Sequence, residues 1–139
     1  MEKGGKVSQK GNAFDIDKAI DYLKKNSVPP YGEGKCAKHV RLGILAGGID
    51  ITPNPVPAKE YGPYLEKYGF KEISANSYNP VKGDIIVMQD FIGATTPYGH
   101  IEMYGGTEWI SDFKQTDLYP SSKYKKHNAE YKIYRWKAK

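Results

Sequence analysis

The spacing of apolar residues divides the chain into a helical first half and a strand-rich second half. Apolar positions recur at helical spacing over residues 14–25, 36–46 and 58–68. Short apolar runs rich in β-branched residues follow over residues 70–73, 85–89, 100–104, 108–112 and 131–136. We therefore expect an α+β fold in which N-terminal helices pack on a C-terminal antiparallel sheet.

The first twelve residues show no such pattern. They are rich in Gly, Lys, Ser and Gln, and Asn12 or Asp15 can cap the first helix. A chain of 139 residues has the length of one domain. We therefore expect residues 1–12 to form a flexible N-terminal arm and residues 13–139 to form a single domain.

Charge and hydropathy narrow the classes of partner. Lys and Arg number 21 against 16 Asp and Glu, a net charge of +5 that favours nucleic acid, acidic lipid or an anionic cell-wall polymer. No apolar run approaches the roughly 20 residues that span a bilayer, so we expect no stable membrane insertion. The N-terminus also lacks the apolar core of a secretory signal.

The single cysteine, Cys36, follows a loop rich in Pro and Gly over residues 26–34 and begins a helical pattern. It cannot form an internal disulfide. A thiol at a helix start has its thiolate stabilised by backbone N–H groups and the helix dipole, which lowers its pKa. Cys36 is therefore a candidate nucleophile, although a lone cysteine is more commonly a small core residue.

A cysteine nucleophile needs a base within hydrogen-bond reach and a third group that orients the base. His39 lies on the same helical turn as Cys36 and is interpreted as a surface or groove residue, and His127 lies in a solvated Lys-rich stretch. His100 follows a glycine and begins a strand, from which its side chain can reach a helix start. His100 is therefore the predicted base.

The third residue depends on the register of a hairpin joined by Gly105-Gly106. A three-residue loop places Asp112 opposite His100, and a two-residue turn places Ser111 there. Asp112 is favoured chemically, because its carboxylate can accept the second N–H of the imidazole.

Three strings resemble the papain-like NlpC/P60 and CHAP superfamily of cell-wall cysteine amidases. Residues 34–41, with Gly34-Lys35-Cys36-Ala37 and Val40-Arg41, resemble its nucleophile at a helix start. Residues 80–87 resemble its P-x-x-G-D turn into a core strand, and residues 98–104 resemble the G-H strand that supplies the base. The short length, basic charge and missing signal are more particularly similar to amidase effectors of type VI secretion systems.

This resemblance implies a papain-like fold and a cysteine amidase without a cofactor. By position it makes Cys36 the nucleophile, His100 the general base and then acid, and Asp112 the orienting residue. Backbone N–H groups at the helix start, including that of Cys36, would hold the oxyanion. Tyr31 and Gln89 are weaker candidates for substrate binding.

The implied substrate is an amide bond in a peptidoglycan stem peptide or cross-link, and not nucleic acid. The protein would be secreted without a recognisable signal peptide and act in the periplasm or cell wall of a bacterium. An effector of this kind would have a cognate immunity protein as a partner, whereas a phage lysin or a remodelling enzyme would not.

Three alternatives remain open at the level of sequence. The chain could be a non-catalytic binder of cell wall or polyanion, for which residues 123–127 form the one dense basic stretch. Cys36, His39 and His100 could instead bind a metal, since Cys-x-x-His is a permissible ligand spacing. The same thiol chemistry could also deamidate or transamidate glutamine.

Overall fold

The computed structural model describes residues 14–27, 36–51, 57–94 and 97–137. Its helices are α1 (Ile16–Asn26), α2 (Cys36–Ala46), the 3-10 helix η2 (Ala58–Glu60), α3 (Gly62–Lys67) and α4 (Ser122–Lys126). Its strands are β1 (Phe70–Ile73), β2 (Ile85–Met88), β3 (His100–Tyr104), β4 (Trp109–Ile110), β5 (Lys114–Gln115) and β6 (Tyr131–Trp136). The predicted arm over residues 1–12 lies outside the described residues.

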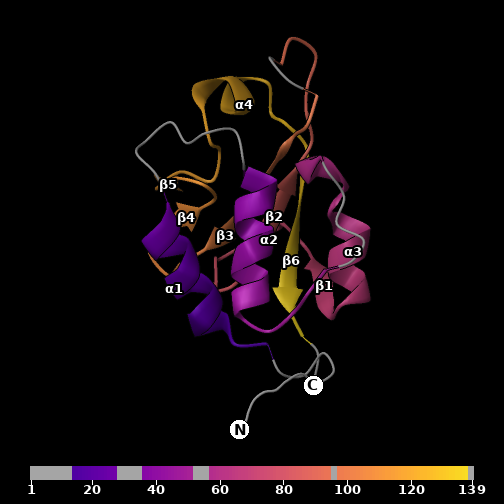
Figure 1. Cartoon of the computed structure of the whole chain (residues 1–139). Helices are drawn as coiled ribbons and strands as arrows, with labels where there is room; N and C mark the ends of the chain where they lie inside the picture. Colours follow the sequence, from indigo (N-terminus) through magenta and orange to yellow (C-terminus); the bar gives the residue numbers. More distant parts are fainter. Residues whose placement is uncertain (1–13, 28–35, 52–56, 95–96, 138–139) are drawn as a thin grey trace, which may run out of the picture.

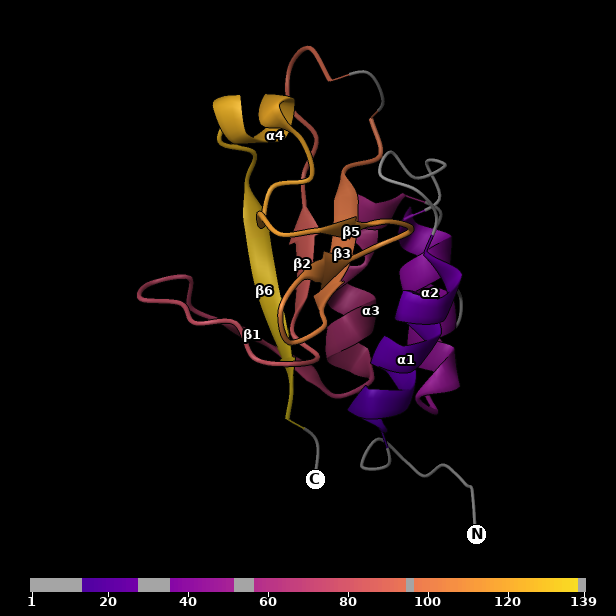
Figure 2. The same ribbon diagram turned by 90° about the vertical axis from the view of Figure 1, so that its left-hand side faces the viewer.

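The strands form one sheet in the order β1-β6-β2-β3-β4-β5, and every neighbouring pair is antiparallel. Helices α1, α2 and α3 lie together on one side of this sheet, and α4 lies at one end of it (Figures 1 and 2). The predicted α+β architecture, with helices packed on an antiparallel sheet, is confirmed. Within the described residues, no helix is both long enough and apolar enough to cross a membrane.

The first two helices form where the apolar spacing predicts them. Asp15 is the N-cap of α1, and its carboxylate accepts the N–H of Lys18 at 3.0 Å. The two helices pack closely because Gly43 has no side chain: a Cβ there would lie 2.8 Å from Leu23 Cγ. Leu45 lies outside the packed face of α2, which is formed by Val40, Gly43 and Ile44, and is 44% exposed.

The prediction of one helix over residues 58–68 is wrong. The chain forms η2, passes through Tyr61 and then begins α3 at Gly62. Pro63 explains the interruption, because proline has no N–H to donate to a preceding turn and is tolerated in the first turn of a new helix.

Strand positions agree well with the prediction, apart from the region after β3. The expected strand over residues 108–112 pairs only through Trp109 and Ile110. Residues 113–126, where the apolar pattern predicts nothing regular, contain β5 and the short helix α4. Ser121 caps α4 by accepting the N–H of Tyr124.

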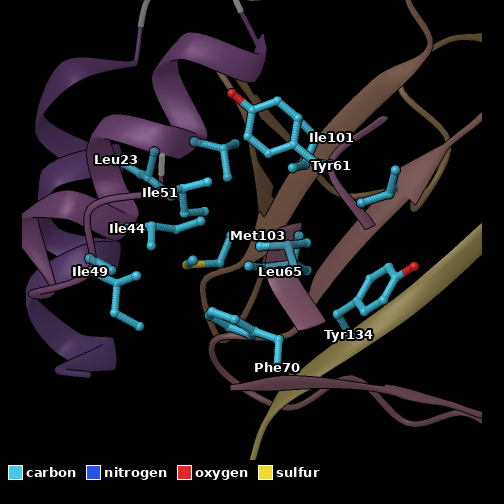
Figure 3. Close-up of a cluster of buried hydrophobic side chains, with 14 of the residues drawn as sticks. Leu23, Ile44, Ile49, Ile51, Tyr61, Leu65, Phe70, Ile101, Met103 and Tyr134 are labelled. Atoms are coloured by element: carbon cyan, nitrogen blue, oxygen red, sulfur yellow. The ribbon is translucent and has the colours of Figure 1, made fainter. Parts of the chain in front are cut away.

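Both faces of the sheet are covered. Ile101 and Met103 of β3 point toward α1, α2 and α3 and meet Leu23, Ile44 and Leu65 in the main core (Figure 3). The opposite face carries a smaller cluster of Ile86, Met88, Trp109, Ala129 and Ile133. Because side chains alternate along a strand, His100 and Glu102 belong to the face opposite Ile101 and Met103.

The turn before β2 is fastened to β6 by one buried carboxylate. Arg135 donates to Asp84 through Nε at 2.8 Å and Nη2 at 2.9 Å. Tyr78 Oη donates to Asp84 Oδ2 at 2.7 Å and the N–H of Val81 donates at 2.9 Å. Asp84 is fully buried. The Asp of the P-x-x-G-D string therefore has a structural role, because it ties the turn to a central strand.

Candidate active site

The thiol of Cys36 lies between the first turn of α2 and the first residues of β3. It is the first residue of α2, and the backbone N–H groups of Ala37 and Ile101 are directed at its sulfur. Ile101 directly follows His100 in sequence. The helix start and the strand start that were predicted to meet do meet in the fold.

The prediction that the pKa of this thiol is lowered is wrong. Burial raises the pKa of Cys36 from 9.0 to about 11, and the two backbone N–H groups only partly oppose this. Nearby Asp112 and Glu102 raise the pKa further through their charge. The physical reason is that loss of hydration outweighs the helix start. Cys36 is therefore a neutral thiol near pH 7.

His100 is the first residue of β3 and is only 5% exposed. Its Nε2 lies 3.0 Å from Glu102 Oε1, and its ring packs near those of Phe113 and Tyr124. Burial lowers the pKa of His100 from 6.5 to about 4, while Asp112 acts in the opposite direction. The imidazole is therefore neutral near pH 7 and can accept a proton, which is the state that a general base requires.

Neither predicted hairpin register is correct. Met103 pairs with Ile110 and Tyr104 with Trp109, so the loop has four residues, and the N–H of Gly105 donates to the carbonyl of Glu108 at 2.8 Å. The pairing ends at Ile110, and neither Asp112 nor Ser111 faces His100 across a ladder.

Asp112 nevertheless lies near both candidate residues. It occupies the tight turn between β4 and β5, is 3% exposed, and accepts the hydroxyl of Ser111 at 3.4 Å. Its charge raises the pKa of both Cys36 and His100, so one carboxylate acts on both groups. Asp112 thus lies within electrostatic reach of both Cys36 and His100, and it is placed there by a turn and not by strand pairing.

Sequence reasoning missed Glu102, whose carboxylate contacts His100 directly. Glu102 is fully buried, and burial raises its pKa well above the usual range. The signal was present, since residues two apart on a strand share a face and Glu102 is two residues beyond His100. A carboxylate two residues beyond the predicted base on the same strand is the pattern that could have identified Glu102.

Backbone geometry before β3 also positions the histidine. Gly99 has φ +71°, and a Cβ at this position would collide with the carbonyl oxygen of Met88 and lie 2.7 Å from Lys59 Cβ. The N–H of Lys59 donates to the carbonyl of Tyr98 at 2.9 Å. Glycine is therefore required for η2 to pack against the strand start that carries His100.

Of the two weaker candidates, only Gln89 lies within the described residues. Tyr31 lies outside the described residues. Gln89 donates to the carbonyl of Lys59 at 3.2 Å and lines a cavity of about 710 Å³ beside β6. The lining of that cavity includes Lys59, Gly62, Gln89, Glu130, Tyr131 and Lys132, and it does not include Cys36, His100 or Asp112.

The other histidines lie elsewhere. His39 Nε2 lies 2.6 Å from the carbonyl oxygen of Asn26, and His127 is exposed and stacks on Phe91. Among the described residues, no group of three or more His, Cys, Asp or Glu side chains is arranged to hold a metal ion. The described geometry gives no support to the metal site of Cys36, His39 and His100.

No protein-family model and no curated protein matches this chain. Among solved structures it is similar to a chain of the native type VI effector-immunity complex Tae3-Tai3 from Ralstonia pickettii, with 39% identity and a TM-score of 0.80. That match covers 89% of this chain and 100% of the other.

A second crystal structure of the same complex, containing selenomethionine, matches with 40% identity and a TM-score of 0.76. It covers 85% of this chain and 99% of the other. In both cases the similar protein is the effector Tae3. The expected resemblance to type VI effectors is confirmed. With this identity over nearly the full length of its relative, the chain belongs to the Tae3 family of type VI effectors.

Proposed function

We propose that this protein is a cysteine amidase that hydrolyses an amide bond in the peptide part of peptidoglycan. The observation that carries the proposal is the position of the Cys36 thiol beside the start of β3, with Asp112 acting on both Cys36 and His100. A thiol, an imidazole and a carboxylate are the groups that nucleophilic acyl transfer requires. Membership of a type VI effector family supports a target in a competing bacterium.

The neutral state of both groups determines the first step. Neutral His100 takes the proton of the Cys36 thiol as the sulfur bonds to the amide carbonyl carbon. The imidazolium then gives that proton to the leaving amine as the C–N bond breaks, which leaves a thioester on Cys36. Water, deprotonated by His100, attacks the thioester and releases the acid, and the proton returns to the sulfur. Asp112 stabilises the imidazolium by its charge.

The oxyanion of each tetrahedral intermediate needs donors close to the sulfur. The backbone N–H of Cys36 at the start of α2 is one proposed donor. The N–H groups of Ala37 and Ile101 that are directed at the resting thiol are available to the same region. No step in this scheme requires a metal or another cofactor.

The proposed fold family, compartment and partner follow from the same observations. We infer a papain-like fold of the NlpC/P60 and CHAP type, since a nucleophile at a helix start beside a strand-borne histidine is the arrangement that the sequence resembles. The protein would be delivered into the periplasm of a target bacterium. The similar effector was crystallised with an immunity protein, and a cognate immunity protein is the partner proposed here.

The test is digestion of purified peptidoglycan, with the products identified by mass spectrometry. Wild-type protein should release products whose masses show an added water at one amide. Cys36→Ala and His100→Ala should abolish release without changing the circular dichroism spectrum, while His39→Ala serves as the matched histidine control. A Cys36→Ala variant with full activity would contradict the mechanism. A product one mass unit heavier, formed when a primary amide is converted to a carboxylic acid with release of ammonia, would identify a deamidase instead.

Gln89 and Tyr31 remain proposed substrate contacts. Because Gln89 lines the cavity beside β6, it would hold a part of the peptide remote from the broken bond. Gln89→Ala should therefore raise KM and change kcat little.

A further inference from the structure

His100 has a closer carboxyl partner than Asp112. Glu102 Oε1 lies 3.0 Å from Nε2 of His100, within one strand, and both side chains are buried. Because they are two residues apart, the pleat of β3 keeps them side by side whatever the surrounding loops do. The contact is therefore fixed by the most regular part of the fold.

The surroundings of Oε2, the second carboxyl oxygen, indicate the charge state of Glu102. Oε2 is buried and has no hydrogen-bond partner among the described residues. An ionised carboxylate with one bare oxygen in such a place costs far more than a neutral acid. Burial accordingly raises the pKa of Glu102, and neighbouring Asp117 adds to the effect. Glu102 is thus a neutral acid, and its Oε1 lies within hydrogen-bond distance of Nε2 of His100.

We propose that Glu102 is the positioning residue of the active site: it accepts the Nε2–H of His100 and thereby leaves the Nδ1 lone pair for the thiol of Cys36. The two nitrogens of a neutral imidazole have opposite roles, so holding one as the donor makes the other the base. Asp112 is then the charged group of the site, and Glu102 fixes the tautomer and the plane of the ring. This inference rests on the proposed amidase function.

Several ionisable groups face the pair and bear on its protonation. They come from different elements packed around β3, namely Cys36 of α2, Asp112 of the β4–β5 turn, Asp117 after β5, Tyr124 of α4 and Tyr78 before β2. Asp112 favours the protonated imidazole, and Asp117 favours the neutral form of Glu102. Both effects favour protonation, but burial still keeps the imidazole neutral near pH 7.

Two substitutions separate a hydrogen-bond role from a charge role. Gln matches a neutral Glu in shape, and its Oε1 can still accept the Nε2–H. Leu fills similar space but cannot accept. Glu102→Leu removes the buried oxygen that has no partner but also leaves Nε2 of His100 without its partner, so this variant should fold with a lower Tm than the wild type. We expect Glu102→Leu to lose on the order of 100-fold in kcat, and Glu102→Gln to recover most of that loss.

The direct readout is the ¹⁵N NMR spectrum of the histidine rings at pH 7, assigned with His39→Gln and His127→Gln. His100 should carry its proton on Nε2 in the wild type and in Glu102→Gln. In Glu102→Leu the two tautomers should interconvert. This measurement needs no substrate, so it remains valid if no peptidoglycan bond is cleaved and the proposed function fails.

Three results would overturn the inference. One is a wild-type His100 with its proton on Nδ1. Another is a Glu102→Gln variant as inactive as Glu102→Leu, which would mean that the charge is needed. The last is a folded Glu102→Leu variant with wild-type kcat. If Glu102→Leu does not fold, the wild-type tautomer and the Glu102→Gln activity still decide the question.

Discussion

The neutral state of Cys36 makes a quantitative prediction about thiol reactivity. Burial raises the pKa of this thiol from 9.0 to about 11, so at any pH well below 9 the folded protein holds about 100-fold less thiolate than the unfolded chain. A thiolate of higher pKa is intrinsically more nucleophilic. With a Brønsted coefficient of about 0.4–0.5, two pKa units recover roughly eightfold in thiol–disulfide exchange. Exchange in the folded protein should therefore be at least about tenfold slower.

The assay is reaction with a neutral chromogenic disulfide, followed from pH 6 to pH 10 in buffer and in concentrated urea. All of the released chromophore reports on reaction at Cys36, because the chain has no other cysteine. The rate constant of the folded protein should rise about tenfold per pH unit across the whole range, while that of the unfolded chain levels off near its pKa of 9.0. Steric protection would lower the folded rate without changing its slope.

The opposite result has a definite form. A thiolate–imidazolium pair would react at a rate nearly independent of pH between 5 and 8, and faster than the unfolded chain at neutral pH. That outcome would refute the reasoning that burial dominates at this site. Proton transfer within the pair would then precede substrate binding and would not accompany attack on the carbonyl.

Three further predictions follow from the described contacts. Since the pKa of His100 is lowered to about 4, its base form persists as the pH falls from 7, and kcat/KM should decline only near pH 4, whereas an ordinary histidine would give a decline near 6.5. Asp84→Asn removes the buried negative charge and one of the two oxygens that accept from Arg135. It should lower stability by about 3 kcal/mol in urea titration, or Tm by roughly 10 °C; a Tm within 2 °C of wild type would contradict the structural role. Gly99→Ala should destabilise the protein and reduce activity more than Gly93→Ala, because both glycines have positive φ but only Gly99 lacks room for a Cβ; equal Tm losses in a thermal melt would show that the collision with Met88 does not matter.

Periodicity was enough to predict most of the fold. Helices α1 and α2 and the strands β1, β2, β3 and β6 lie where apolar spacing indicates, because the helices bury one clear face and the central strands β2 and β3 are short, almost fully buried runs. The break between η2 and α3 at Tyr61 could also have been predicted, since Pro63 cannot continue a helix. The apolar residues on either side of it, however, have the spacing of one continuous helix face. The elements β5 and α4 were missed because each is very short and mostly polar.

The site was harder to predict for two physical reasons. Its residues come from a helix start, a strand start and a turn, and the hairpin loop that sets Asp112 depends on backbone angles such as the φ of +109° at Gly106. The pKa of Cys36 depends on how much of the fold covers the sulfur, which no local pattern encodes. Glu102 is different, because strand alternation alone would have placed it beside His100.

The strand order has a consequence for how the protein acquires activity. Strand β6 follows all other strands in sequence, yet it lies between β1 and β2. Until β6 pairs with both neighbours, one edge of β2 is unpaired. The strands β2 to β5, which include His100, are then not joined to β1 in one sheet. Such long-range pairing makes folding slow compared with local hairpin formation. During synthesis the sheet cannot close before β6 is available, so the candidate site would be complete only after residues 131–136 have been made.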